Sequence, residues 1–216
     1  MIKEDKIKGT ENYLKKLKDA THNYLNALDK PTILEFGVRH GYSTRLFIDY
    51  CEKNQGKLYS VDIDDCSNVS NSSHWEFIQS RDDNFEFLLT KLPKEFDLIF
   101  IDSYHNAEHV KKIFYYYYPF LKKNGLILID DISWIIYLKD KIKNNFNSEI
   151  NNNELFFTLL EILNNNYDNI NIKFDFRGSG IAQILKIENK INPSKKIISR
   201  KLSIKNFLRK IIGAIN

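Results

Sequence analysis

The chain has 216 residues, of which 43% are hydrophobic and 28% charged, so it can bury the core of one globular domain with short additions. No apolar run is long enough to span a bilayer, and the N-terminal MIKEDKIKG lacks the apolar segment of a secretory signal. These features argue against a membrane-spanning or secreted protein. Two cysteines, Cys51 and Cys66, show no metal-ligand spacing and fit a reducing compartment, so we expect a cytoplasmic protein.

The net charge of +4 is unevenly distributed along the chain. Residues 189–216 contain six lysines, two arginines and no acid, which gives this tail a charge of +8 and leaves −4 on residues 1–188. We expect three parts: an N-terminal helical cap over 1–30, a main domain over 31–188, and a basic amphipathic tail over 189–216.

Hydrophobic periodicity predicts alternating helices and strands. The first helix is expected over 11–28, with Thr10 as its N-cap. Helical and Asn-rich segments fill 132–166, where 144–153 is expected to be a loop. Short apolar runs predict strands at 32–36, 57–62, 75–79, 96–101, 126–129, 171–176 and 181–187, with further helices at 43–54, 83–92 and 106–121.

This alternation predicts an α/β fold with parallel strands joined by crossover helices. The close pair of strands at the end predicts an antiparallel hairpin at the sheet edge. The run FDLIFI at 96–101 does not alternate between apolar and polar residues, as expected for a strand that is covered on both faces. In such sheets ligands bind at the carboxyl ends of the strands, so the residues that follow each strand are the candidate site.

The first predicted strand leads into a loop that contains two glycines. Gly37 permits a tight turn, Gly41 would let a ligand approach the backbone, and the following helix offers free N–H groups. A dinucleotide site has the spacing G-x-G-x-x-G, whereas these glycines are four apart and the acid Glu35 precedes them. The spacing therefore favours a nucleoside cofactor without a pyrophosphate. Asp62 ends the second strand and could accept bonds from the ribose hydroxyls; the alternative is a solvated acid at the start of a loop.

Together, the segments Glu35-x-Gly37-x3-Gly41-x-Ser43-Thr44, VDID, FDLIFID and LILIDD resemble class I S-adenosylmethionine-dependent methyltransferases over most of the chain. The resemblance implies a Rossmann-like, seven-stranded, mostly parallel sheet of order 3-2-1-4-5-7-6, with strand 7 antiparallel and helices on its faces. It makes 31–188 a methyltransferase domain and S-adenosylmethionine the cofactor. It also implies that Asp62 holds the ribose and that Asp82, in SRDD, lies near the adenine. The loop motif implies five further cofactor-binding residues: Glu35, Gly37, Gly41, Ser43 and Thr44.

Two later segments narrow the resemblance. IDSYHNAEHVKKIF and NGLILIDDI are similar to bacterial sugar and macrolide O-methyltransferases and cephalosporin-hydroxylase-like proteins. This similarity implies that the methyl acceptor is a sugar or another small hydroxyl compound. The chain departs from the subgroup at Ser103, where glycine is usual, at Ala107, where an aromatic residue is usual, and at Gly125, where a glycine pair is common.

Three aspartates follow the fourth and fifth predicted strands, namely Asp102, Asp130 and Asp131. Neighbouring parallel strands bring their carboxylates to one edge, where oxygen ligands suit Mg²⁺, Mn²⁺ or Ca²⁺. The arrangement resembles divalent-metal-dependent O-methyltransferases, in which the metal would make the acceptor hydroxyl more acidic. The alternative is that Asp130 or Asp131 caps the next helix and Asp102 binds water or the acceptor.

Two candidate catalytic residues lie close together in the sequence. His105 follows Asp102 by three residues and is the candidate general base, because histidine accepts protons near neutral pH. The alternative is a histidine at a helix start that bonds only locally. His105 and His109 also complete the zinc-protease pattern H-x-x-E-H, but the pattern falls inside the methyltransferase segment, so we do not expect a protease.

The basic tail allows several partners. Residues 203–216 can form an amphipathic helix with Ile204, Leu208, Ile211 and Ile215 on one face. This helix could dock on the protein itself, form a homodimer contact, or lie on the inner face of an anionic membrane.

Two other functions stand beside small-molecule O-methylation. An RNA or tRNA methyltransferase could use the tail as an electrostatic arm, although the acidic main body makes nucleic acid an unexpected partner. A non-enzymatic binding protein could keep the fold, but the intact glycine loop and Asp62 argue against it.

Overall fold

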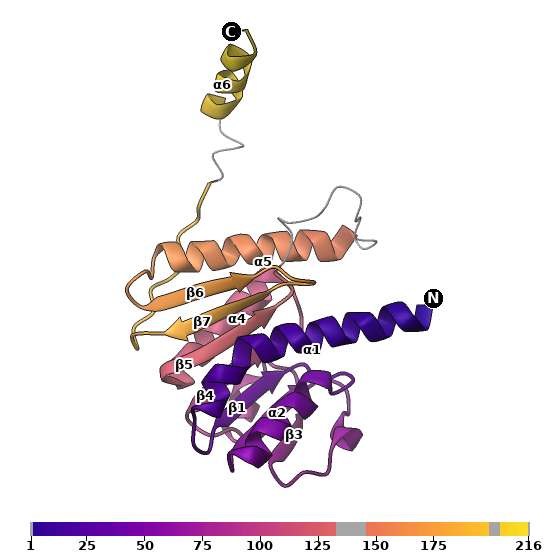
Figure 1. The fold of residues 1–216 in the computed structure, drawn as a ribbon. Helices are drawn as coiled ribbons and strands as arrows, with labels where there is room; N and C mark the ends of the chain where they lie inside the picture. Colours follow the sequence, from indigo (N-terminus) through magenta and orange to yellow (C-terminus); the bar gives the residue numbers. More distant parts are fainter. Residues whose placement is uncertain (1, 133–145, 199–203, 216) are drawn as a thin grey trace.

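The computed structural model describes residues 2–132, 146–198 and 204–215 (Figure 1). A seven-stranded sheet forms its centre. The strands are β1 (Thr32–Phe36), β2 (Lys57–Asp62), β3 (Trp75–Gln79), β4 (Phe96–Ile101), β5 (Leu121–Asp130), β6 (Ile170–Asp175) and β7 (Ile181–Lys186). The α-helices are α1 (Ile2–Asn26), α2 (Tyr42–Lys53), α3 (Phe85–Leu89), α4 (Ala107–Tyr117), α5 (Phe146–Asn164) and α6 (Ile204–Ile215), and two short 3-10 helices are η1 (Ser67–Val69) and η2 (Tyr118–Phe120).

The strand order is β3-β2-β1-β4-β5-β7-β6, which confirms the predicted topology. The pairs among β1 to β5 are parallel, and β7 runs antiparallel to both β5 and β6. The register aligns the carboxyl ends of the central strands, because Phe36 lies beside Val61 and Ile101, and Ile101 lies beside Ile129. The residues that come next in each strand or loop therefore meet at one edge of the sheet.

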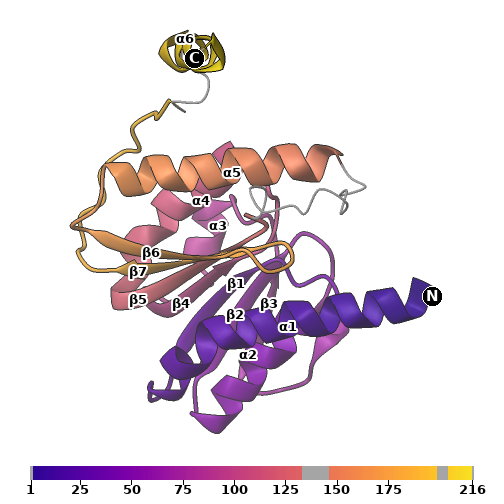
Figure 2. The same cartoon turned by 45° about the horizontal axis from the view of Figure 1, so that its top comes forward.

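Apolar side chains cover both faces of the sheet. On one face, α1 and α2 pack over Ile33 and Phe100; on the other, α4 and α5 pack over Leu34 and Ile99 (Figure 2). Every residue of β4 is buried, which explains why its sequence does not alternate between apolar and polar residues.

Two local predictions were wrong. Helix α1 begins at Ile2, so Thr10 lies inside it and does not cap it. The added segment contains three lysines and one glutamate, residues that propagate a helix well. The predicted loop at 144–153 is helical from Phe146 onward, while 144 and 145 lie outside the described residues. In α5 the buried Leu155 and Leu159 pack on the core, and this packing outweighs the weak helix propensity of asparagine.

The consecutive tyrosines on α4 serve packing. Tyr117 and Tyr118 are buried, and Tyr116 stacks on Phe85 with ring centroids 3.6 Å apart. The helix ends at Tyr117, and the 3-10 helix η2, which contains Pro119 in its first turn, follows from Tyr118. Within the described ranges, no helix combines the length and apolar character that crossing a bilayer would require.

Candidate active site

The loop between β1 and α2 depends on its two glycines for steric reasons. Gly37 has φ +95°, and a Cβ there would lie 2.3 Å from the carbonyl oxygen of Asp102. Gly41 has φ +70°, and a Cβ there would lie 2.3 Å from the Val69 side chain. Both conformations and both close approaches exclude larger residues. Gly41 is thus required by packing against Val69, and it does not line the cavity described below, so its contact with a cofactor stays a prediction.

Glu35 lies beneath this loop and holds it to the sheet. Its fully buried carboxylate accepts hydrogen bonds from Ser43 Oγ (2.5 Å), Thr44 Oγ1 (2.8 Å) and Ser60 Oγ (2.7 Å). Neither Glu35 nor Thr44 lines the cavity, because their polar atoms hydrogen-bond to each other below the loop. In this structure both residues support the loop, and their contact with a cofactor stays a prediction.

Burial raises the pKa of Glu35 from its ordinary 4.5 to about 7, against the lowering effect of its three hydroxyl donors. Because the folded state then binds the proton more tightly, the contribution of Glu35 to stability is full below the ordinary pKa. It is lost as the pH rises through 7, by about 3 kcal/mol. The side chain of the Glu35→Gln variant cannot ionise. We therefore expect the free energy of unfolding of the wild type to fall relative to that of Glu35→Gln as the pH rises from about 5 to 8. Urea unfolding of both proteins across this range measures the difference.

Glu76→Gln, at an exposed position, is the matched control, and its free energy of unfolding should change with pH as that of the wild type does. A difference between Glu35→Gln and wild type that stays constant with pH would show that Glu35 has the same proton affinity in the folded and unfolded chains.

Asp62 closes the loop from the neighbouring strand. Its Oδ2 accepts hydrogen bonds from the backbone N–H groups of Val38 (2.7 Å) and Arg39 (3.0 Å), and its Oδ1 accepts one from Asp64 (3.1 Å). The carboxylate also lines the cavity. It is therefore fixed in orientation where a ribose would lie.

Asp82 is held between two side chains of the segment after β4. Ser103 Oγ donates to it (2.5 Å), and His109 Nε2 lies 2.9 Å from its Oδ2. Ser103, a departure from the subgroup pattern, thus has a structural partner. His109 is turned to Asp82, while the Glu108 side chain is 82% exposed beside Lys111. The H-x-x-E-H residues therefore do not converge, and the protease pattern is accidental.

One cavity of about 1340 Å³ lies along the carboxyl edge of the sheet and is large enough for a nucleoside cofactor and a small acceptor together. It joins the glycine loop to the acidic cluster after β4 and β5. Eight residues predicted for the site line it: Gly37, Ser43, Asp62, Asp82, Asp102, His105, Asp130 and Asp131.

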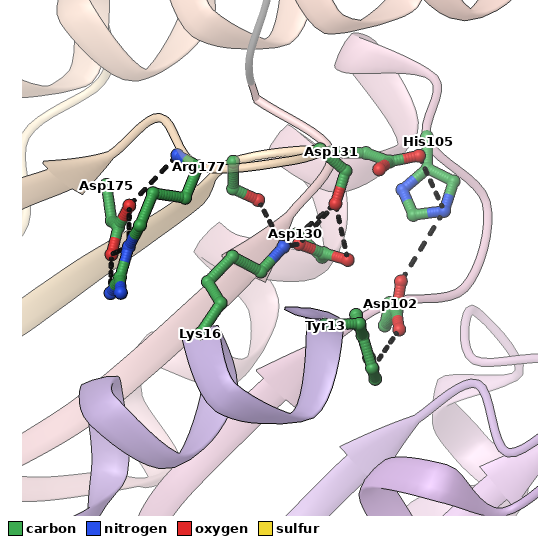
Figure 3. A network of polar contacts seen from close by, with 10 residues as sticks. Tyr13, Lys16, Asp102, His105, Asp130, Asp131, Asp175 and Arg177 are labelled. Carbon is green, nitrogen blue, oxygen red and sulfur yellow. Dashed lines mark hydrogen bonds and ion pairs between the residues drawn. The ribbon is translucent and has the colours of Figure 1, made fainter. Parts of the chain in front are cut away.

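His105 lies between two carboxylates at the end of the cavity (Figure 3). Its Nε2 is 3.6 Å from Asp102 Oδ1 and 3.5 Å from Asp131 Oδ2. Asp131 has φ +61°, a left-handed conformation that aspartate tolerates. Two flanking carboxylates stabilise a positive charge on the imidazole, which is the state a general base reaches when it takes a proton.

Helix α1 contributes two residues that the sequence analysis missed. Tyr13 Oη donates to Asp102 Oδ2 at 2.8 Å. The buried Lys16 ammonium pairs with Asp130 and donates to Ser179 Oγ (2.8 Å) and the Gly180 carbonyl (3.0 Å), as Figure 3 shows in part. One signal in the sequence pointed to them, since a tyrosine and a lysine fall on the same helical face as the buried Leu17.

The acidic cluster carries perturbed carboxyl groups. Burial, followed by the charge of Asp130, raises the pKa of Asp102 well above its ordinary value. Burial also raises the pKa of Asp130, although Lys16 opposes the shift. Tyr13, whose own pKa is raised by burial and then by Asp102, stays protonated and donates to Asp102. Perturbed groups gathered in one cavity are typical of a catalytic site.

The three aspartates do not fit the metal site predicted for them. The Asp130 carboxylate is paired with Lys16, whose charge compensates it where a divalent cation would otherwise do so. Across the described parts of the chain, no group of three His, Cys, Asp or Glu side chains is arranged to hold a metal ion. We therefore derive no chemical step through a metal.

Comparison with known proteins gives a family match over part of the chain. Residues 34–132, which run from β1 through the acidic cluster, match a family model described as a methyltransferase domain. Over these residues, just under half of the chain, the protein therefore resembles a methyltransferase domain. The match covers the glycine loop, Asp62, Asp82 and His105, while Thr10, Tyr13 and Ser179 of the cavity lining lie outside it. No curated protein sequence matches the chain.

Solved structures share the fold of this methyltransferase domain. MycE from the mycinamycin biosynthetic pathway, in complex with Mg, S-adenosylhomocysteine and mycinamycin VI, is 22% identical with a TM-score of 0.58, over 84% of this chain and 51% of MycE. A Staphylococcus aureus protein described as a caffeoyl-CoA O-methyltransferase is 20% identical (TM-score 0.60; 81% of this chain, 82% of that one). The Podospora anserina methyltransferase PaMTH1, bound to S-adenosylhomocysteine, is 20% identical (TM-score 0.56; 72% and 71%). The chain thus spans about half the length of MycE.

Proposed function

We propose that this protein transfers a methyl group from S-adenosylmethionine to a hydroxyl oxygen of a sugar or another small compound. The observation that carries the proposal is one continuous cavity that is lined both by Asp62, at the end of β2, and by His105. The carboxylates of Asp102 and Asp131 flank His105 in this cavity. The neighbours MycE and PaMTH1, solved with S-adenosylhomocysteine, support the choice of cofactor.

Different residues of the cavity would bind the cofactor and take the proton. Gly37, Ser43 and Asp62 would hold the nucleoside end, with Asp62 accepting from the ribose. When bound, S-adenosylmethionine supplies an electrophilic methyl group on a sulfonium. His105 takes the proton of the acceptor hydroxyl as the new O–C bond forms and the S–C bond breaks, so the products are a methyl ether, S-adenosylhomocysteine and a protonated imidazole. Asp102 and Asp131, whose oxygens lie 3.6 and 3.5 Å from His105 Nε2, would stabilise that imidazolium.

We expect Asp62→Ala to weaken the binding of S-adenosylhomocysteine at least about tenfold, because hydrogen bonds to a charged group each contribute about 1.5–3 kcal/mol. Isothermal titration calorimetry measures the affinity. The exposed Asp65→Ala, in the same loop but outside the cavity, is the matched control and should bind as the wild type does. Wild-type protein that binds no S-adenosylhomocysteine would overturn the proposed function.

The acceptor can be found with a radiolabelled methyl donor and a panel of macrolide glycosides, free sugars and catechols, with RNA as a further arm. The proposal expects label in a small hydroxyl compound. Six aspartates line the cavity against two arginines, so the site repels the phosphates of a nucleic acid. Transfer of label to RNA alone would replace our proposal with an RNA methyltransferase.

A further inference from the structure

Helix α6 exposes an apolar face to solvent. Its described large side chains are 42–80% exposed and recur at helical spacing, so they share one face. They are Ile204, Phe207, Leu208, Ile211 and Ile212. The helix lies away from the sheet and its covering helices in both views of the chain (Figures 1 and 2). Docking of this helix on its own domain, one of the alternatives considered from the sequence, is therefore not what the structure shows.

The chain that precedes α6 is anchored to the domain. The Asn192 carbonyl accepts from Tyr115 Oη (3.0 Å) and Asn166 Nδ2 (2.9 Å), and the Ile197 N–H donates to Glu161 Oε1 (3.2 Å). Seven residues then lead to Ile204, a reach of at most about 25 Å. The tail is thus a short tether from the α5 side of the domain.

The positive charge of the tail favours one kind of partner for the apolar face of α6. Residues 189–216 carry eight basic residues and no acid, and the described Lys195, Lys196 and Lys205 are exposed. A second copy of the tail would bring another +8 against this charge, which disfavours a dimer built on α6. Anionic lipid headgroups beside an apolar bilayer interior complement both the charge and the exposed side chains.

We propose that α6, together with the exposed Lys195, Lys196 and Lys205, binds the surface of an anionic lipid bilayer, with α6 lying in the interface and its apolar face toward the acyl chains. The basic residues contact the headgroups, and the anchored tether keeps the domain at the bilayer surface. This proposal stands on the tail and does not depend on the proposed methyl transfer.

The test is flotation of the full chain with two kinds of vesicle, phosphatidylcholine alone and phosphatidylcholine with about 30% phosphatidylglycerol. We expect the protein to float only with the anionic vesicles and to be released by high salt. Phe207→Glu/Ile211→Glu should lower the partitioning by at least about tenfold, because each buried apolar side chain contributes strongly to interfacial binding. Tyr167→Glu is the matched control, since Tyr167 is 66% exposed but lies outside the tail.

The thermal unfolding midpoint of each variant checks that its domain is folded. Wild-type protein that stays unbound with anionic vesicles would overturn the proposal. So would a dimer in light scattering that Phe207→Glu/Ile211→Glu dissociates, because a second copy would then be the occupant of this face.

Discussion

His105→Asn should lower kcat by about 10²–10⁴-fold while leaving the affinity for S-adenosylhomocysteine unchanged, because the imidazole would lose its role as general base. The asparagine keeps a polar group of similar size between Asp102 and Asp131 but takes no proton. Initial rates with labelled S-adenosylmethionine and the acceptor found by the panel give kcat, and calorimetry gives the affinity.

The exposed His22, near the C-terminal end of α1 and outside the cavity, provides the matched control. His22→Asn should keep the wild-type rate, since the imidazole hydrogen-bonds to Tyr50 and Asn26 and does not line the cavity. A His105→Asn enzyme with wild-type kcat would remove His105 from the chemistry and leave Asp102 as the remaining candidate base.

Lys16→Met should lower the free energy of unfolding by about 3–5 kcal/mol, because removing one partner of a buried ion pair leaves the other charge uncompensated. Only 2% of the Lys16 side chain and 5% of the Asp130 side chain are exposed. Urea unfolding measures the loss. The double variant Lys16→Met/Asp130→Asn, which removes both charges, should recover most of the stability, and the exposed Lys15→Met should cost little.

The same variant addresses the predicted metal site. With Lys16 absent, the three carboxylates lack a cation, so Mg²⁺ should raise the unfolding temperature of Lys16→Met more than that of the wild type. An equal or larger rise in the wild type would show that Lys16 does not take the place of the metal, and it would restore the prediction of a divalent-metal site at Asp102, Asp130 and Asp131.

The candidate site was partly predictable because most of it follows strand ends. Asp62, Asp102 and Asp130 each close a short apolar run, and parallel pairing in register places such residues at one edge. Glu35 and Thr44 hydrogen-bond to each other and do not line the cavity. Their positions follow from the motif, but whether a side chain points into the cavity or beneath the loop depends on neighbours from other elements.

The contacts of Lys16 and Tyr13 could not be predicted from local sequence patterns. Both sit in a helix that periodicity predicts, yet their partners, Asp130 and Asp102, lie 114 and 89 residues away. No short-range rule gives a long-range pair, because the pairing is decided by how α1 crosses the sheet.

From the sequence alone, the family resemblance implied the strand order, while hydrophobic periodicity and glycine conformation indicated the glycine loop and the edge where the acids gather, because these patterns act within short segments. Only the tertiary structure decided which charge balances the aspartates and which of the motif residues face the cavity. Those properties depend on burial and on contacts between distant segments, and burial sets the cost of every charge in this site.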